Sequence, residues 1–223
     1  MPDRYRLDPH ARSVLIYRWV VFLLAAGFVL RQIVIHGDYT PAGGPFRHLT
    51  VWALLLSFFV ASRMLALTER RSELDWPVLV AVVAALNGMV VVLFWRLELA
   101  GDDLVRIGTP NPPYVDYYIH AVRPALQWFD ALFVYGAIRR LWWSLLALLG
   151  LVSLYIAWVE LFVGPANDTP IGRITEGLPY PFLNDLELPG RFAFYAQAAA
   201  AGAALLLLIF ALTWLLRRGT PVG

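Results

Sequence analysis

The stretch GGPFRHLTVWALLLSFF, residues 43–59, runs from a glycine-proline turn through two basic residues into a long apolar segment. A turn followed by such a segment is typical of a helix that enters a membrane. Thr50 is the last hydroxyl-bearing residue before the apolar segment, where the helix is expected to begin. A threonine in that place can cap the helix, or it can act as a nucleophile at the edge of the bilayer.

The composition of the whole chain is that of a membrane protein. Hydrophobic residues make up 60% of the 223 residues and charged residues 15%, whereas charged residues reach about a quarter of a typical soluble domain. This leaves no room for a separate soluble domain, so we expect residues 1–223 to form a single membrane domain. The chain has no cysteine, which excludes disulfides, thiol catalysis and thiolate metal sites.

Several segments have the length and apolar character that a membrane-spanning helix needs, about 20 residues. The predicted fold is therefore all-α, a bundle of six transmembrane helices. The predicted spans are residues 13–35, 48–67, 76–96, 114–138, 141–163 and 191–216.

The distribution of arginine predicts the direction of these spans. Arginines gather at the two termini and in the segments that join spans two to three and four to five: Arg4, Arg6, Arg12, Arg70, Arg71, Arg139, Arg140, Arg217 and Arg218. The positive-inside rule places these segments, and so both termini, in the cytoplasm. We expect a multi-pass protein of the bacterial cytoplasmic membrane that contacts anionic lipids and no nucleic acid.

Two polar side chains near the predicted outer ends of spans can form a reactive pair. Thr50 lies in the first turn of span two and His120 in the second turn of span four, and both spans run inward. Their depths should differ by about one helical turn, because each residue adds 1.5 Å. A hydroxyl becomes a good nucleophile when a neighbouring base removes its proton, so Thr50 and His120 are the candidate catalytic residues.

Two charged residues flank the candidate base. Asp116 precedes His120 by four residues on the same helical face, where its carboxylate can orient the imidazole. Arg123 can pair with that carboxylate or bind a carboxylate of the substrate. Simpler roles stay open, namely a helix cap for Thr50, a packed histidine for His120, an interfacial carboxylate for Asp116 and a snorkelling arginine for Arg123. Asp130 and Glu160 are expected to be structural partners of an Arg or a Trp.

Other chemistries find less support in the sequence. It contains no nucleophile elbow, phosphate-binding loop, zinc-protease motif or dinucleotide fingerprint. A zinc site formed by His36, Asp38, His48 and His120 is a minority alternative. We therefore expect no metal and no cofactor.

Three motifs in order resemble one protein family. These are GGPFRHLTVWALLLSFF, then YYIHAVRPALQWFDALF, then YPFLND before the last span. Together they resemble the androgen-induced and androgen-dependent tissue-factor-pathway-inhibitor-regulating proteins, including bacterial members, over nearly the whole chain. Members of that family are multi-spanning threonine hydrolases that cleave fatty-acid esters of hydroxy fatty acids. The resemblance implies that Thr50 is the nucleophile and His120 the histidine, while Arg123 stands where an apolar residue is expected.

The residues and the resemblance together predict an intramembrane hydrolase of lipid esters that works through an acyl-threonine. The alternative is a non-catalytic membrane protein that binds or transports a lipid with the same outer polar cluster. A regulatory or assembly role of the cytoplasmic arginines is a third possibility.

Overall fold

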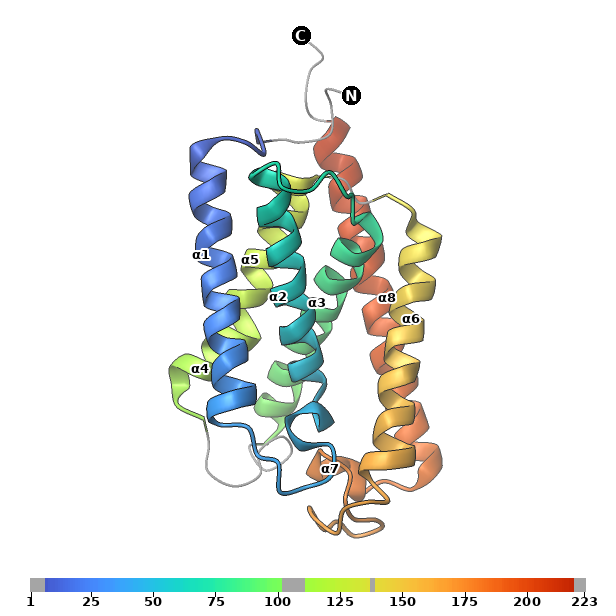
Figure 1. Ribbon diagram of the computed structural model, residues 1–223. Coiled ribbons are helices and arrows are strands. Elements are labelled where there is room, and N and C mark those ends of the chain that lie inside the picture. Colours follow the sequence, from blue (N-terminus) through green and yellow to red (C-terminus); the bar gives the residue numbers. More distant parts are fainter. Residues whose placement is uncertain (1–6, 102–110, 137–138, 219–223) are drawn as a thin grey trace.

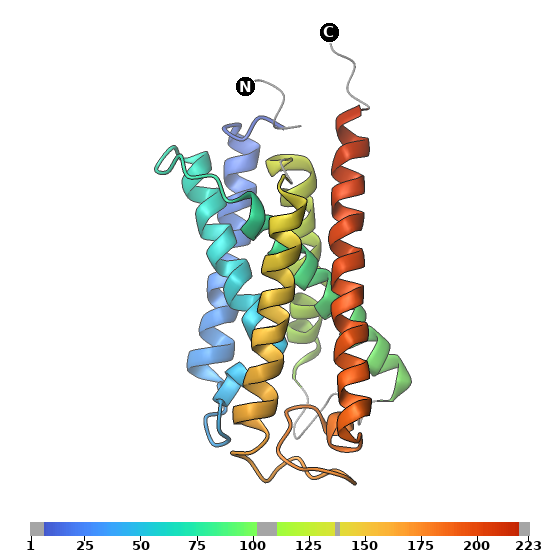
Figure 2. The same ribbon diagram turned by 90° about the vertical axis from the view of Figure 1, so that its right-hand side faces the viewer.

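The computed structural model describes residues 7–101, 111–136 and 139–218, and within them it is a bundle of long helices (Figures 1 and 2). The long helices are α1 (Arg12–Val29, continued by η1, Leu30–Ile35), α2 (Leu49–Thr68), α3 (Pro77–Ala100), α6 (Leu141–Trp158, continued by η6, Val159–Val163) and α8 (Leu188–Arg218). A further helical run comprises α4 (Pro113–Tyr117), η4 (Tyr118–Val122), α5 (Arg123–Phe129) and η5 (Asp130–Tyr135). Two short helices, η2 (Gly44–Arg47) and α7 (Pro181–Asn184), lie in connecting segments.

The all-α membrane fold expected from the sequence is confirmed. In the described part of the chain, five helices are long and apolar enough to cross a membrane, and each matches a predicted span to within a few residues. The predicted span 114–138 corresponds to the helical run 113–135, which carries Asp116, Arg123 and Asp130 and is not among the five. Residues 137 and 138, the end of that prediction, lie outside the described residues.

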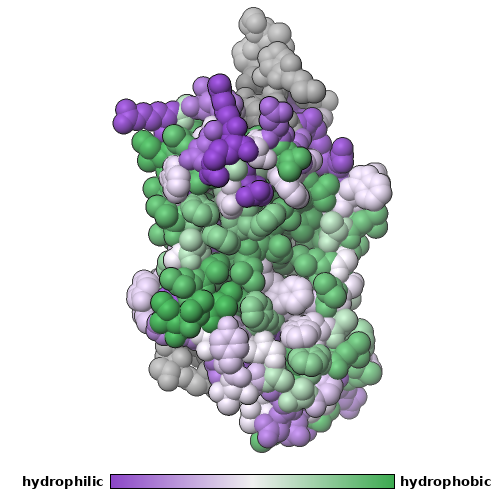
Figure 3. Space-filling model, viewed as in Figure 1, coloured by the Kyte–Doolittle hydropathy of each residue, from purple (hydrophilic) through white to green (hydrophobic). Residues whose placement is uncertain are grey.

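The surface supports a membrane position for the bundle. In Figure 3 a broad apolar band crosses the middle of the visible face, and hydrophilic residues gather toward both ends. The start of α1 and the end of α8 lie at one end of the bundle, and α7 lies at the opposite end (Figure 1). We call these the terminal end and the α7 end. That the terminal end faces the cytoplasm stays a prediction from the arginine distribution.

Helix α3 forms the centre of the bundle, because it packs against α2, α5, α6 and α8. Small residues permit the closest of these approaches. Gly202 of α8 is buried, and a Cβ atom built on it would lie 2.4 Å from the Met89 sulfur of α3. The Ala- and Gly-rich part of the last span therefore packs closely, as its composition predicts.

Replacing Gly202 with valine should destabilise the protein by about 1–3 kcal/mol, since the added atoms force α3 and α8 apart. The measurement is the thermal unfolding midpoint in detergent. Gly150→Val is the matched control, because a Cβ at Gly150 meets no atom within 4 Å. Equal midpoints for the two variants would contradict close packing at Gly202.

Buried ionic groups join distant helices, as the sequence predicted for Asp130 and Glu160. The Arg18 guanidinium donates two hydrogen bonds to the Asp130 carboxylate, each 2.9 Å long. At the α7 end, the Glu160 carboxylate accepts hydrogen bonds from Arg191 and from the Tyr195 hydroxyl. Both carboxylates are therefore structural partners of an arginine.

Candidate active site

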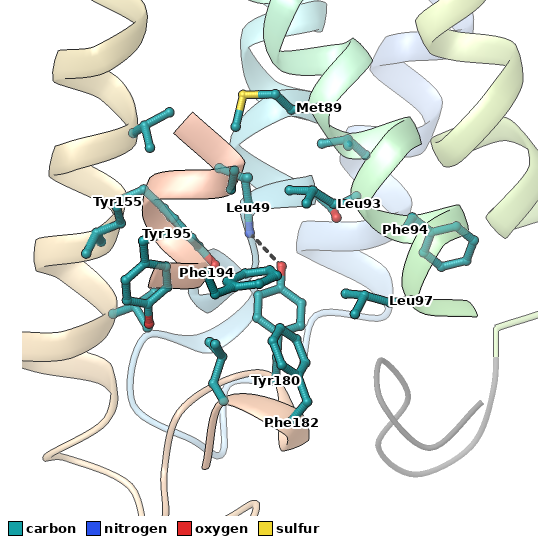
Figure 4. Close-up of a pocket in the computed structure, with 17 residues that line it drawn as sticks. Leu49, Met89, Leu93, Phe94, Leu97, Tyr155, Tyr180, Phe182, Phe194 and Tyr195 are labelled. Atoms are coloured by element: carbon teal, nitrogen blue, oxygen red, sulfur yellow. Dashed lines mark hydrogen bonds between the residues drawn. The ribbon is translucent and has the colours of Figure 1, made fainter. Parts of the chain in front are cut away.

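A small apolar cavity lies at the α7 end, where α2, α3, α6 and α8 meet the segment that carries α7. Its volume is about 80 Å³, and it is partly open to the surface. Most of its walls are aliphatic and aromatic side chains, and Figure 4 shows how they converge from the separate helices. Leu49 and Thr50 place the start of α2 at this cavity.

The turn before α2 positions Thr50. Gly43 and Gly44 have φ angles of +85° and +50°, a conformation in which a residue with a side chain would be strained. The turn is then held by three hydrogen bonds, in which Trp52 and Trp158 donate to the Phe46 carbonyl and Tyr155 donates to the Arg47 carbonyl. The chain thus enters α2 in a fixed direction.

Thr50 is not the cap of this helix. His48 occupies the N-cap position with an extended backbone, and its side chain makes no capping hydrogen bond. Thr50 is the second residue of α2, it is partly exposed, and it lines the cavity. The capping role considered from the sequence is therefore not one that Thr50 fills, and Thr50 lies in the cavity wall.

Two tyrosine hydroxyls surround the start of α2. The Leu49 amide donates to the Tyr180 hydroxyl oxygen at 3.3 Å, shown by the dashed line in Figure 4. Burial raises the pKa of Tyr180, and hydrogen bonds with Tyr155, Leu49 and the Thr50 side chain act in the opposite direction. Tyr180 therefore stays protonated at neutral pH and lies beside the Thr50 hydroxyl.

His120 lies in the π-helical turn η4 and is buried. Its Nδ1 is 3.1 Å from the Asp116 backbone carbonyl oxygen. Because a carbonyl only accepts, this hydrogen bond assigns the proton to Nδ1 and leaves Nε2 as the basic nitrogen. Single π-helical turns are often found at functional sites.

The phenyl ring of Phe94 is in contact with His120 and also forms part of the cavity wall. It stacks flat on the imidazole, with 3.5 Å between ring centroids and 1° between planes, and Phe94 also lines the cavity. Thr50 thus lies on the cavity surface, whereas His120 lies behind one aromatic side chain of its wall. The Trp95 indole fixes this turn by donating to the His120 carbonyl at 3.1 Å.

Asp116 and Arg123 have surroundings that the sequence did not predict. Asp116 contacts the His120 ring through its backbone carbonyl, and its carboxylate accepts a hydrogen bond from Asn111. The Arg123 side chain is 1% exposed and donates through Nη2 to the Ile119 carbonyl. Among the described residues its Nε and Nη1 have no hydrogen-bond partner. Arg123 is therefore a buried residue of the bundle interior and not an exposed snorkelling one.

His48, two residues before Thr50, is a second imidazole to consider, but it is a weak candidate base. Arg47 Nε donates to its Nε2 at 3.1 Å. Burial, and to a lesser extent the Arg47 charge, lower its pKa to about 4. A group with such a low pKa accepts a proton poorly at neutral pH. Among the described residues, no group of three or more His, Cys, Asp or Glu side chains gathers to hold a metal ion.

Sequence reasoning missed the tyrosines of this site. Tyr155 and Tyr195 project from spans, where they read as ordinary apolar residues, and Tyr180 lies in a loop 130 residues after Thr50. The only signal was the motif YPFLND, whose tyrosine, phenylalanine and leucine line the cavity.

The chain matches one protein family. The profile of the family described as FAR-17a/AIG1-like protein matches residues 13–213. The chain therefore belongs to this family, that of the androgen-induced proteins. No curated protein and no solved structure matches the chain.

Proposed function

We propose that the protein is an intramembrane hydrolase of lipid esters, with Thr50 as the nucleophile and His120 as the general base. The observation that carries the proposal is that Thr50, which is the second residue of α2 and not its N-cap, lines an apolar cavity. Family membership is compatible with hydrolase activity. The apolar walls suit an acyl chain, and the polar groups at the start of α2 suit the ester.

The reaction would proceed in two halves. His120 Nε2 takes the proton of Thr50 as the hydroxyl oxygen attacks the ester carbonyl carbon. The carbon–oxygen bond to the alcohol then breaks, and the proton passes from His120 to the departing alkoxide. In the second half, His120 takes a proton from water, whose oxygen attacks the acyl-threonine, and this proton returns to the Thr50 oxygen as the fatty acid leaves.

In the present arrangement the Phe94 ring stacks on the His120 imidazole, so the proposed reaction requires this ring to move and His120 to approach Thr50. Catalytic hydrogen bonds often form only when substrate is bound. The covered imidazole is also the one feature that favours the second candidate, a lipid-binding protein without chemistry.

Covalent labelling separates the two candidates. Purified wild-type protein is treated with a lipophilic fluorophosphonate, and its intact mass and labelled peptide are measured. We expect one adduct on Thr50 in the wild type, none in Thr50→Ala, and wild-type labelling in Thr40→Ala, which removes an exposed threonine of the preceding loop. A folded wild-type protein without an adduct, or with label that persists in Thr50→Ala, would overturn the proposal.

A further inference from the structure

We propose that Tyr180 is a catalytic residue of this site: its hydroxyl donates a hydrogen bond to the negatively charged oxygen that forms when Thr50 attacks an ester. The inference rests on the proposed function and adds a third reacting group. It also assigns a role to the segment between η6 and α8, residues 164–187, which carries Tyr180 and which we call the outer loop.

The hydrogen bonds around Tyr180 leave its proton available. The Leu49 amide donates to the Tyr180 oxygen, so it uses a lone pair and not the phenolic proton. Tyr155 donates its own single proton to the Arg47 carbonyl at 2.8 Å. Toward Tyr180, the Tyr155 hydroxyl oxygen can therefore act only as a hydrogen-bond acceptor. Tyr180, Tyr155 and Thr50 line the same cavity, so the Tyr180 proton can be donated to an oxygen of Tyr155 or to one at Thr50.

Negative charge that develops at Thr50 determines which of these oxygens accepts the Tyr180 hydrogen bond. In the resting state the Thr50 hydroxyl is neutral, and so is the Tyr155 hydroxyl. Once an oxyanion forms on the carbon attached to Thr50, it is by far the stronger acceptor, because hydrogen bonds to charged oxygens are about twice as strong as neutral ones. The Tyr180 proton stays on Tyr180 and only its hydrogen bond is redirected, so no bond to hydrogen is broken.

The amide behind Tyr180 strengthens this donor. The Leu49 N–H is one of the donors at the start of α2 that have no partner within the helix, and a helix start carries partial positive charge. Its hydrogen bond to the Tyr180 oxygen polarises the phenol toward donation. Leu49 and Tyr180 both line the cavity, so this hydrogen bond lies at the cavity wall.

The outer loop holds Tyr180 in place from the other side. Tyr180 is the N-cap residue of α7, and the buried Asn184 at the end of α7 closes the loop. The Asn184 side chain accepts from the Leu178 amide and donates to the Leu178 carbonyl, at 3.1 and 3.0 Å. Its backbone carbonyl accepts from the amides of Ile174 and Thr175. A donor held in this way needs little rearrangement when charge develops.

The test compares wild type with Tyr180→Phe, which keeps the ring and removes only the hydroxyl. Hydrolysis of a fluorogenic medium-chain ester gives kcat and KM, and the fluorophosphonate gives the rate of labelling at Thr50. We expect kcat and the labelling rate to fall about 100-fold with KM changed less than threefold, since one oxyanion donor commonly contributes 100- to 1,000-fold. Tyr17→Phe is the control, because it also deletes one buried hydroxyl hydrogen bond, to Leu126, near the terminal end.

The outcomes separate the two proposals. If wild type labels at Thr50 and hydrolyses the ester, and Tyr180→Phe does so within threefold of its rates, Tyr180 is not catalytic and the proposed function stands. If wild type neither labels nor hydrolyses, both proposals are overturned. A lower unfolding midpoint of Tyr180→Phe with an unchanged kcat would assign Tyr180 a structural role only and would also overturn the inference.

Discussion

Replacing His120 with glutamine is expected to lower the rate of ester hydrolysis by about 100- to 10,000-fold, the usual contribution of a general base. The glutamine amide can still donate to the Asp116 carbonyl, and it can still lie against the Phe94 ring, so the turn η4 keeps its contacts. It cannot accept the proton of Thr50. The loss should therefore appear in kcat and in the labelling rate, with the unfolding midpoint little changed.

Two other histidines serve as comparisons for this prediction. His36→Gln changes an exposed residue and should leave the rate within twofold of wild type. His48→Gln should have a smaller effect than His120→Gln, because the low pKa and the Arg47 hydrogen bond make His48 a poor base. The base is wrongly assigned if His120→Gln hydrolyses esters normally while His48→Gln does not.

The sequence predicted the helices well, because hydropathy over about 20 residues is a local property. The helical run 113–135 shows where this reasoning weakens. Its π-helical turns η4 and η5 and its buried polar residues depend on neighbouring helices, which a hydropathy window does not register. Arg18 shows the same limit, because it lies in an apolar span and its partner Asp130 is 112 residues away.

The candidate site was predictable in part. The position of Thr50 follows from where the apolar segment begins, and the structure places Thr50 at the cavity as that position suggests. The stacking of Phe94 on His120 could not be predicted. The depth of a residue in the membrane does not determine how α3 and η4 are rotated about their axes. Tyr180 was missed for a different reason. Its contact with Leu49 joins residues 131 positions apart and exists only when the outer loop folds back on the bundle.

The motif YPFLND now has a physical explanation. Tyr180 places a hydroxyl beside Thr50, and Phe182 and Leu183 complete the cavity wall. Asn184 closes the loop on Leu178, and the Asp185 carboxylate accepts from the Arg173 amide. One short segment therefore supplies part of the site and the hydrogen bonds that hold it. The outer loop belongs to the site as much as the spans do.

The second large effect concerns stability and lies away from the cavity. Asp130→Ala should reduce the free energy of unfolding by about 3–5 kcal/mol, because it leaves the Arg18 charge buried without its carboxylate. Arg18 is 1% exposed. Its remaining hydrogen bonds, to the Met64 carbonyl at 3.0 Å and the Thr68 hydroxyl at 2.7 Å, solvate the guanidinium but cannot neutralise it. The measurement is the unfolding midpoint and free energy in detergent.

Two comparisons show whether the loss comes from an unpaired charge. Arg173→Ala removes the guanidinium of an exposed pair with Asp185 and keeps the backbone amide that donates to Asp185, so it should barely change the midpoint, since water screens that pair. The double variant Arg18→Met with Asp130→Leu removes both charges and keeps apolar volume, so it should recover most of the lost stability. If the double variant is as unstable as Asp130→Ala, the cost arises from lost packing between α1 and η5 and not from the buried charge.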